Sequence, residues 1–120
     1  MRHIWRTALY ARMLSHPGMT IFLGLDETGS PASTATLIVI PNLTRSMRPY
    51  ALIENVVSLE THRGRGFGKA VVTYAIDAAW QAGCYKVMLL TGSNRPAVHR
   101  FYEACGFVQN KTGFQIRRSA

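Results

Sequence analysis

The stretch THRGRGFGKAV, residues 61–71, decides how we expect this chain to fold. The residues before it, ALIENVVSL (51–59), are typical of a β-strand because branched apolar side chains dominate. The residues after it, VVTYAIDAAWQAG (71–83), place apolar side chains three and four positions apart, as an amphipathic helix does. Three glycines alternate with basic residues at the strand-to-helix turn, and this arrangement calls for a reason beyond connection.

Phosphate binding is one such reason. A helix N-terminus presents unpaired N–H groups and the positive end of the helix dipole. Glycines let the backbone approach an anion without a Cβ in the way. Arg63, Arg65 and Lys69 add positive charge around the same point. The turn therefore predicts a site for phosphate or pyrophosphate.

The glycine spacing excludes two common phosphate motifs. A Walker loop would need glycine at Arg63 and a hydroxyl residue at Ala70. The dinucleotide fingerprint G-x-G-x-x-G fails at its third glycine in either register. The pattern that fits is R-x-x-G-x-G, filled by Arg63, Gly66 and Gly68. Alone, such a turn is also often a plain connection between a loop and a helix.

The other elements follow from periodicity and from turn residues. We expect helices at 3–15, 66–82 and from Pro96 to Cys105, with Asn94 as the N-cap of the last, and strands at 20–25, 34–40, 50–59, 85–90, 107–108 and 114–117. The face of helix 66–82 that is expected to be buried comprises Phe67, Ala70, Val71, Tyr74, Ala75 and Ala78. Gly83 and Gly106 are expected to end their helices. The order predicts one α+β domain, residues 1–120, with a mixed sheet.

Composition limits the class of protein. The 120 residues carry a formal net charge of +8, which favours a partner with several negative charges, namely nucleic acid, an anionic membrane or a polyphosphate. No stretch approaches the roughly 18 apolar residues of a membrane span. Cys84 and Cys105 have no metal-ligand spacing with the histidines and are expected to be small buried side chains in a reducing, cytoplasmic protein. The acid-free N-terminus also resembles a transit peptide, but we expect it to be a helix of the fold.

The glycine turn and its flanks resemble the coenzyme A site of the GNAT superfamily of acetyl-CoA-dependent N-acetyltransferases. IENVVSLETHRGRGFGKAVV (53–72) resembles the central strand, pyrophosphate loop and following helix, and NRPAVHRFYEACGF (94–107) resembles the signature helix. Among members, IENVVS, GCYK, FYEACGF and FQIR most resemble glucosamine-phosphate N-acetyltransferases. The resemblance implies a mostly antiparallel central sheet flanked by helices, acetyl-CoA as co-substrate, no metal and a small-molecule primary amine as acceptor.

The same resemblance assigns the cofactor-binding residues. The backbone of Val56, Val57 and Ser58 would face the pantetheine amides. The pyrophosphate would be wrapped by the loop, which comprises Arg63, Gly64, Arg65, Gly66, Phe67, Gly68 and Lys69. Asn94 would bond the pantetheine arm, although helix capping explains it equally well.

For catalysis, the resemblance places the hydroxyl of Tyr102 near the thioester sulfur, where it can protonate the departing thiolate. Glu54 resembles the acceptor-binding glutamate and could take part in removing the amine proton. Asn55 stands where the sugar-phosphate enzymes have aspartate, and Arg117 corresponds to a ligand of the acceptor phosphate. Ordinary alternatives are a packed tyrosine, a solvated carboxylate and a basic tail.

Family members usually have a strand and a helix before the one expected at 3–15, so the resemblance implies a shortened front that a partner chain completes, as in a homodimer. A catalytically weak acyl-CoA-binding or regulatory module is the alternative that this front favours. A nucleic-acid binder is disfavoured because the arginines are scattered along the chain and no recognition motif is present. We also expect no membrane partner.

Overall fold

The computed structural model describes residues 11–119. The chain divides into two compact units, Met1–Leu89 and Leu90–Ala120, which we describe one at a time. Residues 11–15 are helical, in agreement with the end of the helix expected at 3–15, and the rest of that prediction lies outside the described residues. Within residues 11–119, no helix combines the length and the apolar character needed to cross a membrane.

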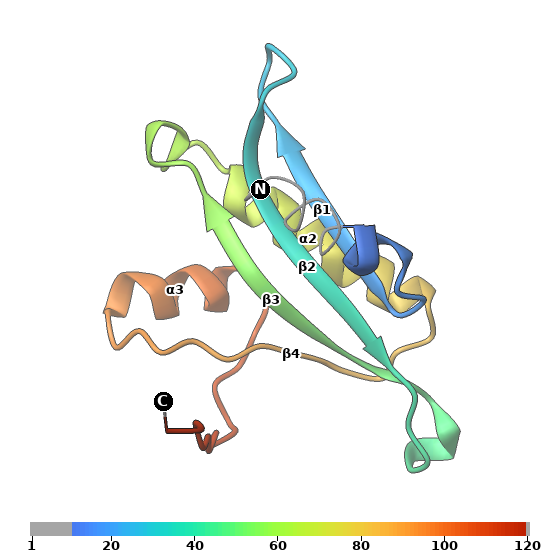
Figure 1. Ribbon diagram of the computed structural model, residues 1–120. Coiled ribbons are helices and arrows are strands. Elements are labelled where there is room, and N and C mark those ends of the chain that lie inside the picture. The colour runs from blue at the N-terminus through green and yellow to red at the C-terminus, as the bar shows by residue number, and fades with distance from the viewer. Residues whose placement is uncertain (1–10, 120) are drawn as a thin grey trace. The chain divides into compact units, whose positions relative to one another are not determined.

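The first unit is built on a four-stranded sheet in the order β1-β2-β3-β4 (Figure 1). The strands are β1 (Met19–Leu25), β2 (Pro31–Ile40), β3 (Tyr50–Ser58) and β4 (Val87–Met88). The first three strands pair antiparallel and β4 pairs parallel with β3. This confirms the α+β class and the mixed, mostly antiparallel sheet.

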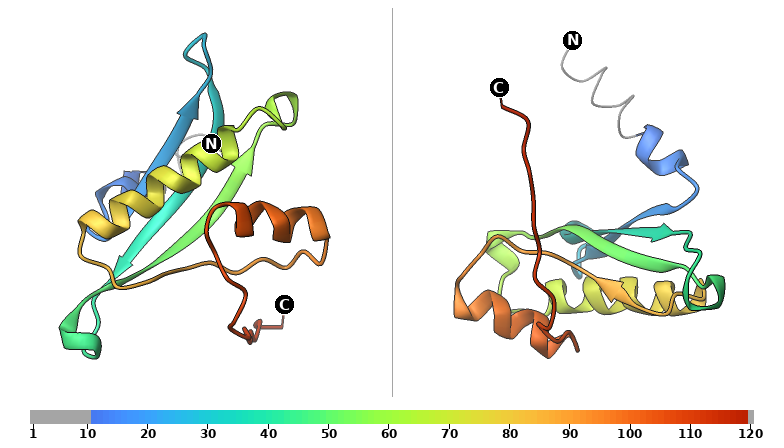
Figure 2. Two further views of the ribbon diagram at one scale, coloured as in Figure 1. Left: turned by 180° about the vertical axis from the view of Figure 1, so that it is seen from behind. Right: turned by 90° about the horizontal axis from the view of Figure 1, so that it is seen from below.

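Helix α2 (Phe67–Gln81) covers one face of this sheet, as the left panel of Figure 2 shows from behind. Its buried residues are Gly68, Val71, Val72, Ala75 and Ala79. The prediction that Ala70 and Tyr74 are buried is wrong, since both are exposed. Their spacing fits an apolar stripe, but the buried stripe runs through Val71, Val72, Ala75 and Ala79, and Tyr74 lies beside it with its ring 5.8 Å from that of Phe22 on β1. Gly83 adopts φ +84°, the left-handed end that its position predicts.

The core of the first unit lies between α2 and the middle strands. Ile53 on β3 and Val72 on α2 are the largest fully buried side chains. Burial of each contributes about 1.5–3 kcal/mol. Cys84, just after α2, is buried as expected, and burial raises the pKa of its thiol. These contacts hold the first turn of α2 at a fixed place over the sheet.

Strand β4 is shorter than the expected strand 85–90, because only Val87 and Met88 pair with β3. Their partners are Ala51 and Leu52, near the start of β3. Farther along β3, Asn55 has φ +55° and the register with β2 shifts between Thr34 and Thr36. An extra residue in one strand of an antiparallel pair is a β-bulge, which bends the strand and ends regular pairing.

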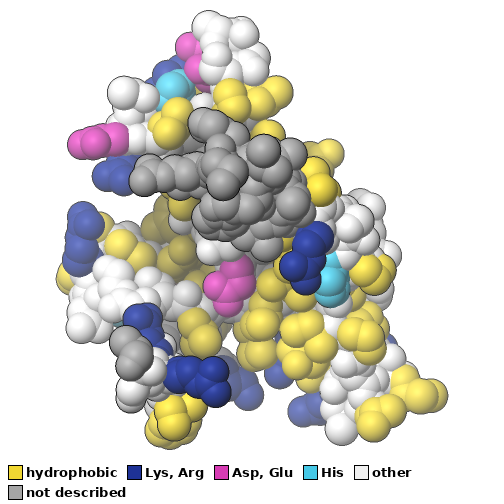
Figure 3. All heavy atoms as spheres, viewed as in Figure 1, with side chains coloured by type: hydrophobic (Ala, Val, Ile, Leu, Met, Phe, Trp, Pro, Cys, Tyr) yellow, Lys and Arg dark blue, Asp and Glu magenta, His cyan; other side chains and the backbone are white. Residues whose placement is uncertain are grey.

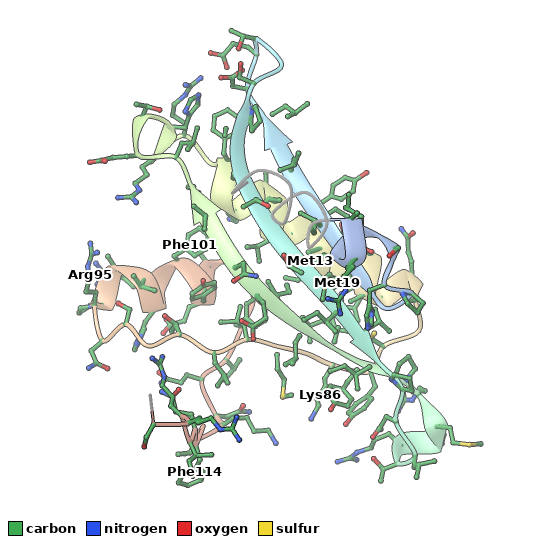
Figure 4. All side chains as sticks on the ribbon, viewed as in Figure 1. Met13, Met19, Lys86, Arg95, Phe101 and Phe114 are labelled. Atoms are coloured by element: carbon green, nitrogen blue, oxygen red, sulfur yellow. The ribbon has the colours of Figure 1, made fainter. Side chains whose placement is uncertain are left out.

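The second unit contains α3 (Pro96–Ala104) followed by a segment without helix or strand. The expected N-cap Asn94 is wrong: Arg95 occupies that position, and its N–H is held by Ser93 Oγ at 3.2 Å (Figure 4). Gly106 adopts φ +103° after the helix, as predicted. The expected strands at 107–108 and 114–117 are wrong. Phe114 and Ile116 are 93% and 97% exposed, so the apolar alternation there has no sheet to pair with in this unit.

Candidate functional site

The glycine turn forms an open cradle at the N-terminus of α2. Gly64 and Gly66 adopt φ +80° and +85°, a left-handed backbone that favours glycine. Gly66 is the N-cap of the helix, and no side chain caps it. A Cβ added at either glycine would meet nothing within 4 Å. The glycines are therefore needed for the backbone path, while the space beside them remains open.

The N–H groups of this cradle are available to a ligand. The first hydrogen bond of α2 runs from the N–H of Ala70 to the carbonyl of Gly66 at 3.0 Å. Across residues 11–119, no partner accepts a hydrogen bond from the main-chain N–H groups of residues 64–69. Together with the positive end of the helix dipole, this run of donors suits an anion with several oxygens.

The three basic side chains of the turn differ in their engagement. Arg65 binds the carboxylate of Glu27 with Nη2 2.9 Å from both oxygens, and its guanidinium carbon lies 5.2 Å from the ring centre of Phe67. Arg63 and Lys69 are exposed and, in the part of the chain that the structure describes, their side chains have no hydrogen-bonding or ionic partner. Two of the three cations are thus directly available to an anion.

The end of β3 offers a second set of backbone groups. The N–H of Leu59 donates to Ala32 of β2 at 2.8 Å, and Val57 is paired with Thr34. Because N–H directions alternate along a strand, the N–H groups of Val56 and Ser58 point away from β2. On that side β4 pairs only as far as Leu52. The strand edge before the glycine turn is therefore unpaired within the first unit.

Glu54 and Asn55 lie where the bulge begins. Glu54 is exposed and faces Thr36 across the β2–β3 pair. Asn55 takes the left-handed conformation, which asparagine tolerates better than most residues. The bulge itself was not predicted from the sequence. The only local signal is an asparagine inside an otherwise apolar strand.

Three predicted site residues lie in the second unit. Tyr102 of α3 is half-buried, with its ring 5.1 Å from that of Phe101 and 6.2 Å from that of Phe107. Burial, with a smaller contribution from Cys105, raises the pKa of Tyr102 above its ordinary value, at which the hydroxyl is already protonated at neutral pH. Asn94 and Arg117 are exposed, and Arg117 Nε donates to Gln115 Oε1 at 3.3 Å.

The structure thus brings together the predicted residues from Glu54 to Lys69 in one unit. It also shows residues that the sequence did not single out. These are Asp26, Glu27 and His62: a hydrogen bond between His62 and Asp26 and an ion pair between Arg65 and Glu27 join the glycine turn to the β1–β2 connection. No local pattern marks them, because their partners lie 36 and 38 positions away in the sequence.

The sequence also matches a known protein family. The chain fits the family model described as acetyltransferase (GNAT) family over residues 1–107. The chain therefore belongs to the GNAT acetyltransferase family.

Individual relatives agree with this membership. Glucosamine 6-phosphate N-acetyltransferase of Trypanosoma brucei brucei is 38% identical over 82 residues, covering 68% of this chain and 54% of the relative. A solved structure of an Agrobacterium tumefaciens protein that carries the name acetyltransferase is 64% identical with a TM-score of 0.90, covering 94% of this chain and 78% of the other. Glucosamine-6-phosphate N-acetyltransferase of Arabidopsis thaliana is 27% identical with a TM-score of 0.79, covering 94% and 75%. The chain spans about half the length of the curated relatives it matches.

Proposed function

We propose that this protein transfers an acetyl group from acetyl-CoA to a primary amine of a small molecule. The observation that carries the proposal is the run of unpaired N–H groups at residues 64–69, at the N-terminus of α2 and next to the unpaired edge of β3. A pyrophosphate needs several converging donors, and the pantetheine arm carries amides that can pair with a strand edge. The unpaired edge of β3 and the glycine turn are adjacent in the chain, just as the pantetheine arm and the pyrophosphate are adjacent in coenzyme A.

The first unit supplies the binding groups. The N–H groups of residues 64–69 hold the pyrophosphate oxygens, and Arg63 and Lys69 add charge. The unpaired main-chain groups of Val56 and Ser58 are better placed for the pantetheine amides than those of Val57, which faces β2. Val57 instead offers a side chain that is 53% exposed.

The reaction needs no covalent enzyme intermediate. The amine nitrogen forms a bond to the acetyl carbon, the carbon–sulfur bond breaks, one proton leaves the nitrogen and one reaches the thiolate. Tyr102, whose hydroxyl is protonated at neutral pH, supplies the second proton. Glu54 accepts the first, directly or through water. The remaining contribution of the chain is to hold the two reactants in register.

For the acceptor, we propose an amino sugar phosphate as the first compound to test, because several relatives are named glucosamine 6-phosphate N-acetyltransferases. Glu54 and Asn55 would contact the amine side of the acceptor, and Arg117 its phosphate. The chain carries Asn55 where the resemblance leads us to expect aspartate, so a related amine could be preferred over glucosamine 6-phosphate. A homodimer remains a prediction that light scattering of the purified protein tests.

The test combines binding and turnover. Calorimetric titration with acetyl-CoA should give saturable binding with one coenzyme per chain, with ATP and dephospho-coenzyme A as weaker controls. Release of free thiol in the presence of an amine panel, headed by glucosamine 6-phosphate, then identifies the acceptor. Binding without thiol release from any amine would favour a non-catalytic acyl-CoA-binding module. Absence of binding by a folded chain would refute the proposal.

A further inference from the structure

The connection between β1 and β2 is organised around one carboxylate. Oδ1 of Asp26 accepts hydrogen bonds from the N–H of Thr28 at 2.9 Å, the hydroxyl of Thr28 at 2.6 Å and the N–H of Ser30 at 3.0 Å. These bonds fix the turn, as Asp side chains commonly do. The other oxygen, Oδ2, is left to point out of the turn.

That oxygen meets the glycine turn. His62 Nε2 lies 2.9 Å from Asp26 Oδ2, and the two side chains are only 15% and 9% exposed. Because an ionised carboxylate can only accept, Nε2 carries the shared proton. The other ring nitrogen, Nδ1, lies 2.9 Å from the hydroxyl of Thr61. Both edges of the imidazole are thereby fixed.

The imidazole in turn contacts the first residue of α2. Its ring stands edge-on to that of Phe67, with centres 5.5 Å apart and planes at 75°. Phe67 is also held from the sheet, since Ser33 Oγ donates to its carbonyl at 2.9 Å. The sheet leaves no spare room here, because a Cβ on Gly24 would lie 2.3 Å from Ser33 Oγ.

A second contact, the ion pair between Glu27 and Arg65, joins the same two segments and is more exposed to solvent. Glu27, the neighbour of Asp26, binds Arg65. The guanidinium carbon of Arg65 lies 5.2 Å from the ring centre of Phe67. Figure 3 shows acidic, histidine and basic side chains gathered at this end of the hairpin. Two adjacent acids of one turn therefore hold two residues of the glycine turn, and both of those residues pack on Phe67.

We propose that Asp26 and His62 are positioning residues for the coenzyme: they hold the glycine turn and the first turn of α2 in the conformation that binds the pyrophosphate. The inference rests on the proposed function and adds residues that touch no ligand themselves. Asp26 fixes His62, His62 fixes Phe67, and Phe67 sets the direction of the first N–H groups of α2. A cradle of glycines is flexible by itself, and an external brace reduces the conformational freedom lost on binding.

The contacts from Asp26 through His62 to Phe67, which we call the brace, also explain why Arg65 is paired with Glu27 rather than free for a ligand. A loop arginine that is paired with Glu27 and stacked on Phe67 acts on the shape of the cradle. Arg63 and Lys69, whose side chains are unpaired across the described residues, act on the charge of the ligand. The three cations of the turn are thus divided between two tasks.

The test measures acetyl-CoA binding by calorimetry in the wild type, Asp26→Asn, His62→Gln and the double variant. Asp26→Asn keeps an oxygen that can accept the bonds of the turn while removing the charge that faces His62. We expect each single variant to weaken binding about 5- to 10-fold, and the double variant to be no weaker than the worse single one. In turnover assays, KM for acetyl-CoA should rise while kcat stays within about twofold.

Glu60→Gln is the matched control. Glu60 is exposed in the connection between β3 and α2, which also carries His62. Its substitution changes the net charge by the same amount as Asp26→Asn. This variant should bind acetyl-CoA as the wild type does. Equal dissociation constants for Asp26→Asn, His62→Gln and Glu60→Gln would overturn the brace, as would additive losses in the double variant. A variant that only lowered the folded fraction would change the stoichiometry and leave the dissociation constant unchanged.

A second measurement is independent of the ligand. Amide hydrogen exchange of Ala70, whose N–H donates to the carbonyl of Gly66 at 3.0 Å, should become faster in Asp26→Asn and His62→Gln than in Glu60→Gln, while exchange in the middle of α2 stays unchanged. If the wild type failed to bind acetyl-CoA, the proposed function would fall, and with it the claim that the brace serves a coenzyme. Unchanged exchange of Ala70 would refute the brace itself.

Discussion

Replacing Gly66 by alanine separates the conformation of the glycine turn from its function. Gly66 has φ +85°, and a Cβ there would meet nothing within 4 Å. The protein therefore suffers no steric clash, and the cost is that of a left-handed alanine, about 1–2 kcal/mol. The reduced freedom of the unfolded chain offsets roughly 0.4–1 kcal/mol of this. We expect a net loss of about 1 kcal/mol, which lowers Tm by a few degrees.

The loss of binding should be much larger than the loss of stability. The open space beside Gly66 is where the proposed pyrophosphate lies, and relief of the left-handed strain turns the N–H of Phe67 away from it. One hydrogen bond to a charged group contributes about 1.5–3 kcal/mol. Its loss weakens acetyl-CoA binding by roughly 10- to 100-fold.

Gly83→Ala supplies the control for this prediction. Gly83 has φ +84° at the other end of α2, and a Cβ there also meets nothing within 4 Å. Thermal unfolding should show similar losses for Gly66→Ala and Gly83→Ala, while calorimetry should show weakened acetyl-CoA binding for Gly66→Ala alone. Equal affinity in the two variants would refute the reasoning that places the pyrophosphate at this turn.

Three further predictions concern the other parts of the molecule. Tyr102→Phe should lower kcat by roughly 100-fold with acetyl-CoA affinity unchanged, whereas Tyr74→Phe, at a tyrosine that is 69% exposed, should leave both unchanged; equal kcat values would exclude Tyr102 as the proton donor. Ile53→Ala should cost about 2–5 kcal/mol in urea unfolding, and a loss below 1 kcal/mol would contradict the packing of α2 on β3. Hydrogen bonds from Thr28 and His62 hold the pKa of Asp26 well below its usual range. The stabilising effect of the Asp26 carboxylate is therefore present above about pH 4 and is lost as the pH falls further. The free energy of unfolding in urea, measured between pH 5 and pH 2, should depend less on pH in Asp26→Asn than in the wild type.

The glycine turn and its flanks could be predicted from the sequence because their structure is local. A strand of branched residues, glycines at positions of positive φ and apolar spacing of three and four are properties of neighbouring residues. The left-handed conformations of Gly83 and Gly106 follow from the same local rule. The loop residues were singled out by their glycines and charge and Tyr102 by resemblance, and their roles remain predictions.

The errors lie where structure depends on distant partners. The apolar residues 114–117 have the alternation of a strand, but a strand forms only when another strand pairs with it, and none does so in residues 90–119. Tyr74 fits the apolar stripe of α2, and only the position of the sheet decides that it is exposed.

The sequence by itself determined the class of fold and the order of the central elements, and it predicted anion binding at residues 61–71. Only the tertiary structure decided the bulge at Asn55, which exists through its register with β2, the hydrogen bond between Asp26 and His62, and the ion pair between Glu27 and Arg65. The physical reason is that helix caps and periodicity are set by bonds within a few residues. A bulge depends on the partner strand, and the contact between Asp26 and His62 joins residues 36 positions apart. Both exist only after the strands have paired in the correct register.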